Sequence, residues 1–118
     1  MELGVQNGTA TLTSFVDGNA SIYFSSGGGI IGGFAHQNVH NAAVQFVTEA
    51  TKFLNVMSRV NDFPLPIIGN ISFYALTDKG VLTITANEKQ LQDKKAAIWP
   101  LYYLGQNVIT QLRTISPG

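Results

Sequence analysis

A glycine-rich run before the two histidines of the chain is the first candidate for chemistry. Residues 27–32 read Gly-Gly-Gly-Ile-Ile-Gly and match the pattern G-x-G-x-x-G between a predicted strand and a predicted helix. Main-chain amides and a helix N-terminus can bind a phosphate at such a place. The dinucleotide form of the motif needs a parallel βαβ unit, whereas the preceding strand here belongs to a predicted hairpin. We expect a close-packed turn, with a small-ligand or anion site at Gly27, Gly28, Gly29 and Gly32 as the alternative.

His36 and His40 are the second candidate. They are four residues apart, so both side chains project from the same side of a predicted helix. Such a pair can bind a metal ion, but a zinc site requires further protein ligands, and the chain has no cysteine and no carboxylate nearby in sequence. We therefore expect no metal and no cofactor, and interpret the histidines as a partly buried pair at the helix start. Ligand binding beside the glycine run is the alternative.

No group of residues typical of a catalytic centre is visible. Asp17 and Asp78 stand where turns favour aspartate, and Asp62 stands in a proline-flanked connection. The chain has neither a G-x-S-x-G motif nor a cysteine nucleophile. We expect no catalytic residue, and an enzyme is the less favoured alternative.

Aromatic and aliphatic side chains form a third group of candidates, for protein contacts. One set surrounds Pro100 at the start of a predicted helix, where tyrosine and tryptophan offer a large contact area for little entropy. The other set alternates with the predicted core residues of two strands and would give the second face of a sheet an apolar surface. The predicted interface residues are Tyr23, Tyr74, Leu76, Trp99, Tyr102 and Tyr103.

The elements that would position these residues fall into two similar halves. In the first half, strands over residues 9–16 and 20–25 flank a turn, and a glycine-rich connector leads to an amphipathic helix over residues 36–59. Pro64 and Pro66 then indicate a surface connection over residues 61–69.

The second half repeats the pattern. Strands over residues 71–77 and 81–86 flank an Asp-Lys-Gly turn, and Asn87 is a good N-cap for a short helical turn. Whether residues 87–98 hold helix, strand or loop is left open. Pro100 then suits the first turn of a helix whose apolar stripe runs to Ile115.

The predicted fold is of the α+β class: a two-layer α/β sandwich in the order ββαββα. Its sheet has four or five mostly antiparallel strands, and both helices cover one face. Residues 1–118 form a single domain. The sheet residues expected in the core are Ile22, Phe24, Phe73, Ala75, Leu82 and Ile84.

Composition limits the partners. Seven basic residues balance seven acidic ones in 118 residues, which excludes the electrostatic footprint of a nucleic-acid binder. No targeting segment and no run of about 18 apolar residues is present, so we expect no membrane and a cytoplasmic protein. Charged residues make up only 12%, about half the usual share, which favours a homo-oligomer, a dimer first.

Three stretches make the chain resemble a family of small bacterial proteins of unknown function: residues 20–33, 73–81 and 108–113. The likeness spans most of the chain and implies a bacterial, cytoplasmic origin, but it carries no activity and no catalytic residues. In the order of its elements the chain is also similar to roadblock and profilin-like domains, which often dimerise and act as scaffolds or regulators of small GTPases.

Together these features predict a non-enzymatic, homo-oligomeric interaction module with a possible protein partner. Its contact surface would be the second sheet face, a strand edge or the aromatic helix start. The alternative is a small-ligand or anion-binding domain, with or without enzymatic activity, at the Gly27–Gly33 loop with His36 and His40.

Overall fold

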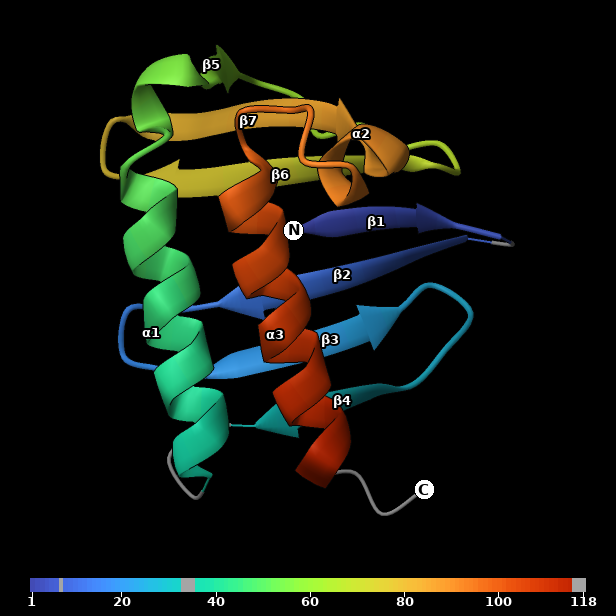
Figure 1. The fold of residues 1–118 in the computed structure, drawn as a ribbon, viewed down its shortest axis with the longest axis vertical. Helices are drawn as coiled ribbons and strands as arrows, with labels where there is room; N and C mark the ends of the chain where they lie inside the picture. The colour runs from blue at the N-terminus through green and yellow to red at the C-terminus, as the bar shows by residue number, and fades with distance from the viewer. Residues whose placement is uncertain (7, 33–35, 116–118) are drawn as a thin grey trace.

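The computed structural model describes residues 1–6, 8–32 and 36–115. Within these residues a single antiparallel sheet has seven strands in the order β4-β3-β2-β1-β6-β7-β5 (Figure 1). The strands β1 and β6, which are far apart in sequence, therefore lie side by side in its middle. The strand bounds are β1 (Glu2–Val5), β2 (Gly8–Ser14), β3 (Ala20–Phe24), β4 (Gly29–Gly32), β5 (Ser58–Val60), β6 (Asn70–Thr77) and β7 (Gly80–Asn87).

Two long helices cover one face of this sheet, and Figure 1 shows them side by side in front of it. They are α1 (Gln37–Thr51) and α3 (Trp99–Ile115), accompanied by the short helix α2 (Glu88–Gln92) and a single 3-10 turn, η1 (Leu54–Val56). The α+β class and the mostly antiparallel sheet are confirmed. The predicted number of strands was too low, and α2 adds a third helix.

The hydrophobic core lies between the sheet and the two long helices. Ile22 and Phe73 are buried as predicted, whereas Phe24, at the end of β3, is exposed. The stripe of α1 packs inward with Val39, Ala42, Ala43 and Phe46. The largest fully buried side chains are Leu12, Ile71, Leu91, Leu101, Leu112, Val39 and Val108.

Asn87 caps α2, which lies in the segment whose structure the sequence left open. Its side-chain oxygen accepts hydrogen bonds from the main-chain N–H groups of Lys89, at 3.0 Å, and Gln90, at 3.3 Å. These bonds satisfy two of the donors that a helix start leaves free. Residues 88–92 are therefore helical and not a further strand.

The glycine-rich connector is the first correction, because it forms the hairpin β3–β4 and not a loop leading directly into a helix. Gly27 and Gly28 have φ values of +115° and +82°, which only glycine adopts readily, and they make the turn. Gly29 then pairs with Tyr23, and a side chain on Gly29 would collide with the main-chain oxygen of Ile22. Close strand pairing therefore accounts for this glycine.

The predicted helix over residues 36–59 is the second correction, since α1 ends at Thr51 and Ser58–Val60 forms β5. This strand pairs with β7, opposite Val81, Leu82 and Thr83. The pairing satisfies backbone groups along an edge of β7. The pattern of apolar side chains did not reveal β5, because these residues join the sheet through main-chain hydrogen bonds.

No helix among the described residues is both long enough and apolar enough to span a membrane.

Candidate functional site

The middle of the sheet is interrupted because β1 is shorter than its two neighbours. Glu2 lies opposite Thr11 of β2 and Ser72 of β6, and Met1 exchanges main-chain hydrogen bonds with Leu12 at 2.9 and 2.8 Å. Beyond this point β2 and β6 continue with no described strand between them. Each lies one strand spacing from β1, so they stand about 9–10 Å apart where β1 begins. Figure 1 shows the chain start between them.

We call this space the sheet gap; it lies between residues 13–14 of β2 and residues 74–77 of β6. Alternate residues of an antiparallel strand direct their N–H and C=O groups to opposite sides. The main-chain N–H and C=O groups of Leu12 both bond to Met1. Ser14 lies two residues further along β2, so its main-chain N–H and C=O groups point to the same side and face the gap. Glu2 is paired with Ser72 on the other side, so Tyr74 and Leu76 face the gap from β6.

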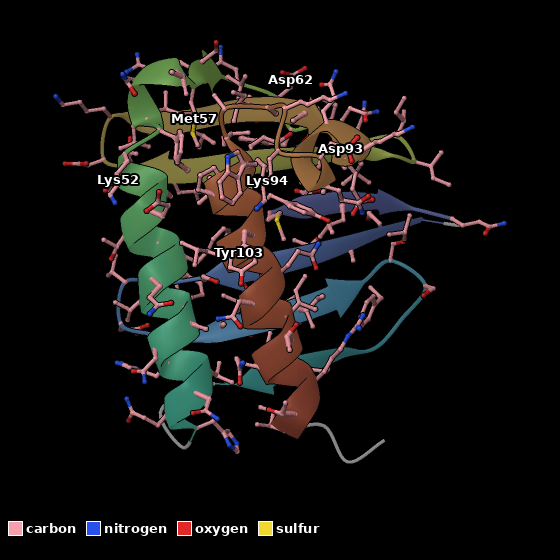
Figure 2. All side chains as sticks on the ribbon, viewed as in Figure 1. Lys52, Met57, Asp62, Asp93, Lys94 and Tyr103 are labelled. Carbon is pink, nitrogen blue, oxygen red and sulfur yellow. The ribbon has the colours of Figure 1, made fainter. Side chains whose placement is uncertain are left out.

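The sheet gap opens into a cavity of about 830 Å³ that reaches the helix side of the sheet. Its walls are mostly apolar and come from β1, β2, β6, β7, α1, α3, η1 and the segments beside them. Figure 2 shows Met57 between the end of α1 and the start of α3. The apolar residues of the helix side that line the cavity are Phe46, Val47, Ala50, Leu54, Met57, Phe73 and Leu101.

The cavity lining also contains buried polar atoms that have no hydrogen-bond partner. Glu2 Oε2 and Ser14 Oγ are buried without a hydrogen-bond partner, and they are the two such side-chain atoms in the described part of the chain. Burial lowers the pKa of the Met1 α-amino group to about 6, while the Glu2 carboxylate opposes this shift. Unpaired buried oxygens cost free energy, so this region is not optimised for stability as it stands.

A connection crosses the open face of the sheet next to the gap. We call residues 61–69 the strap. The Tyr74 hydroxyl donates a hydrogen bond of 3.0 Å to the main-chain oxygen of Pro64, and the rings of Phe63 and Tyr74 meet edge to face, with centroids 5.8 Å apart. Gly69 N–H donates to Gly4 O at 3.2 Å, and a side chain on Gly4 would collide with Ile67 O. The strap therefore lies directly on β1 and β6.

Large apolar side chains are exposed at the mouth of the cavity and along the strap. At the mouth they are Phe15, Val16, Phe63 and Leu76. Further along the strap they are Leu65, Ile67 and Ile68, of which Ile67 is 71% exposed. Contiguous apolar surface of this kind is typical of an interaction site.

The predicted ligand residues are not brought into one site. Gly27 and Gly28 lie at one end of β4 and Gly32 at the other, about 13 Å away for a strand of this length. Gly32 packs towards Val39 and Leu112, and Gly33 lies outside the described residues.

The two histidines follow at the start of α1. His36 is exposed at the N-cap position without a side-chain cap, and His40 is half-buried with its ring against Gly18. The described residues contain no group of three or more potential metal ligands.

The predicted interface residues fall into three different settings. Tyr23 and Leu76 are exposed on the open face, at 47% and 82%. Tyr74 is half-buried beneath the strap, and burial, followed by the Glu2 charge, raises its pKa.

The three predicted aromatic residues at the start of α3 also lie in different environments. Lys94 Nζ stands 4.9 Å above the ring of Trp99. The Tyr102 hydroxyl donates to Glu88 Oε2 at 3.0 Å, and burial is the main cause of its raised pKa. Tyr103 is 66% exposed on the outer side of α3 (Figure 2). With Glu49 and Lys94, Trp99 and Tyr103 border a second cavity of about 390 Å³.

Sequence reasoning missed the sheet gap and the strap's position. The gap depends on how far β2 and β6 extend past Met1 in the assembled sheet, which no local pattern encodes. The strap did leave a signal, because residues 63–68 are six consecutive apolar residues in a connection expected at the surface.

Comparison with protein-family models, with the curated proteins and with the solved structures found no match. The observed order, with four strands before α1, also differs from the order on which the likeness to roadblock and profilin-like domains was based. Functional inference therefore rests on the geometry of the chain itself.

Proposed function

We propose that the protein is a non-enzymatic interaction module that accepts an extended peptide segment in the sheet gap. One observation carries the proposal: the main-chain groups of Ser14 on one side, and of Tyr74 and Leu76 on the other, face each other across a space of one missing strand. An added strand is a common way to recognise a peptide, since main-chain hydrogen bonds supply affinity and alternate side chains supply specificity.

A segment of three residues is enough to reach all of these groups. Continuing the register of β1, its residues would lie opposite Tyr74, Ser14 and Leu76 in turn. Each hydrogen bond contributes about 0.5–1.5 kcal/mol net, and ordering each residue costs about 1–2 kcal/mol. Main-chain pairing therefore roughly balances its own entropy, and side-chain burial must supply the affinity.

The lining supports binding better than catalysis. Its acidic side chains are Glu2 and Asp17, and Asp17 is occupied in a turn, where Oδ1 and Oδ2 accept hydrogen bonds from Asn19. No histidine lines the cavity within the described residues. A catalytic acid–base pair would need a second group at the same place.

A chain extended before Met1 tests whether the gap accepts a strand. The extension Thr-Leu-Thr should lengthen β1, raise Tm by several degrees and protect the amides of Ser14, Tyr74 and Leu76 from hydrogen exchange. The matched control is Gly-Ser-Gly, which has the same length but little strand propensity and no apolar side chain. Protection of these amides to the same degree without any extension would contradict an open gap.

Binding in trans is tested with a displayed library of random heptapeptides, selected against the 118-residue chain. Selected peptides should protect the same three amides and should lose binding to the Thr-Leu-Thr variant. Peptides that bind both proteins equally would show that the gap is not the binding site.

A second candidate function is self-association through the open face, favoured by the exposed Leu65 and Ile67 of the strap. A standard interface buries about 800 Å² on each partner, which an apolar strap and its neighbours could supply. Light scattering across a hundredfold dilution should then give a dimer, and the double variant Leu65→Lys, Ile67→Lys should give a monomer of unchanged fold. A wild-type monomer at every concentration would exclude this candidate.

A further inference from the structure

We infer that the segment accepted by the sheet gap is anchored by one large apolar side chain, carried by the residue that lies between Ser14 and Ala75. The inference rests on the proposed function and adds the chemistry of the partner. It follows from the side to which that residue must point and from the size of its neighbours.

The direction is set by the register. Successive side chains along a strand alternate between the two faces, and directly opposed residues share a face. Leu12 is buried on the helix side, so Ser14 points to the same side, and its partner Ala20 is fully buried. On β6, Phe73 is buried on the helix side, and Ala75 follows two residues later. A residue between Ser14 and Ala75 therefore points towards the helices.

The neighbours leave room for a large group. Serine and alanine are both small, and they flank the place that the anchor side chain would occupy. Beyond them the cavity is bounded by Ala50 of α1, by Leu54 and by Met57, whose flexible thioether adapts to different shapes. No Lys or Arg side chain lines the cavity within the described residues. The acidic residues of the lining are Glu2 and Asp17, so leucine, methionine or phenylalanine fits this environment and an anionic side chain does not.

The two flanking residues of the segment face the other side. They lie opposite Tyr74 and Leu76, next to Phe63 of the strap, where the surface is partly open to water. Threonine, serine or a β-branched residue is suitable there. The expected partner is thus an extended peptide with a large apolar residue between two small or β-branched residues.

The test uses fluorescein-labelled peptides Ser-Thr-X-Thr-Ser with leucine, phenylalanine, alanine or aspartate at X, titrated into the wild-type chain by fluorescence anisotropy. The leucine and phenylalanine peptides should bind at least tenfold more tightly than the alanine peptide, and the aspartate peptide should not bind. Hydrogen exchange on each complex identifies the site through the amides of Ser14, Tyr74 and Leu76.

Ala75→Leu supplies the matched control because it fills the anchor space from the side. Ala75→Leu should lower the affinity of the leucine and phenylalanine peptides at least tenfold. The affinity of the alanine peptide should stay the same. Ala50→Leu fills the same space from α1 and provides the comparison if Ala75→Leu does not fold. Equal affinity of all four peptides, with the three amides protected, would overturn the anchor and leave the proposed function standing. Peptides that protect none of these amides would overturn both.

Discussion

The hydroxyl of Tyr74 in β6 donates a hydrogen bond of 3.0 Å to the main-chain oxygen of Pro64. This bond holds the strap on the open face of the sheet, although most of the strap's large side chains point into solvent. The same tyrosine has main-chain groups that face the sheet gap. Strap and gap are therefore linked through a single residue, and a segment bound in the gap would lie directly beside the strap.

Tyr74→Phe tests how firmly this bond holds the strap. It keeps the ring contact with Phe63 and removes the hydrogen bond. The expected loss in free energy of unfolding is about 0.5–1 kcal/mol, because the bond is solvent-exposed. Limited proteolysis should cleave residues 61–69 several times faster. Tyr23→Phe, on the same face, should change neither quantity, and equal effects of the two variants would argue against the strap contact.

Gly4→Ala tests the close approach of the strap to β1. A Cβ on Gly4 would collide with the main-chain oxygen of Ile67, and main chain cannot move aside as a flexible side chain can. We expect the free energy of unfolding, measured with urea, to fall by about 1–3 kcal/mol. A strand glycine replaced by alanine without a clash would instead raise it by about 0.5–1 kcal/mol. A gain would mean that the strap does not rest on β1.

The two central hairpins and the two long helices could be predicted because their signals are local. Asp17 and Gly18 mark one turn, and Asp78 and Gly80 the other, each between alternating strands. The strands β1, β4 and β5 could not be predicted in the same way. They have three or four residues each, and their stability comes from pairing with a neighbour, as between Arg59 and Leu82.

The candidate site was less predictable than the fold. The glycine run matches a phosphate-loop motif, but the sequence favours a close-packed turn over an anion site there. Positive φ at Gly27 and close strand pairing at Gly29 agree with the turn. The sheet gap has no motif at all. It arises when register places Met1 opposite Leu12, while β2 and β6 extend further. Such a difference in strand length exists only after the sheet has assembled.

Asn87→Ala tests the cap of α2. The side chain accepts two main-chain hydrogen bonds at the helix start, so alanine should lower the free energy of unfolding by about 1 kcal/mol. Asn87→Asp keeps an acceptor oxygen at the same place and should restore most of this loss. Thermal or urea unfolding of the wild type and the two variants measures the free energy of unfolding. An equal loss of stability in both variants would show that capping is not the cause.

Tyr102→Phe tests the contact between α3 and α2, and its effect should depend on pH. The fold raises the pKa of Tyr102, mainly through burial, so it favours the protonated hydroxyl that donates to Glu88. The stabilisation is present below the ordinary tyrosine pKa of about 10 and is lost as pH rises through the higher value of the folded state. The variant should be less stable than wild type by roughly 0.5–1 kcal/mol at pH 7. The difference should shrink at pH 10.5 and above, and a constant difference would contradict the assignment.

A pair of identical substitutions on α1 tests the cavity itself. Ala43 is fully buried in the packed core, whereas Ala50, two helical turns later, is half-buried and lines the cavity. Ala43→Leu should overpack the core and cost about 1–3 kcal/mol. Ala50→Leu should place its side chain in empty apolar space and change stability by less than about 1 kcal/mol, with a gain the expected sign. Both variants replace alanine by leucine on the same helix, so the change in helix propensity is the same and cannot cause a difference in stability between them. Equal destabilisation in urea unfolding would mean that the space beneath Ala50 is already filled, and the sheet gap would then have no room for an anchor side chain.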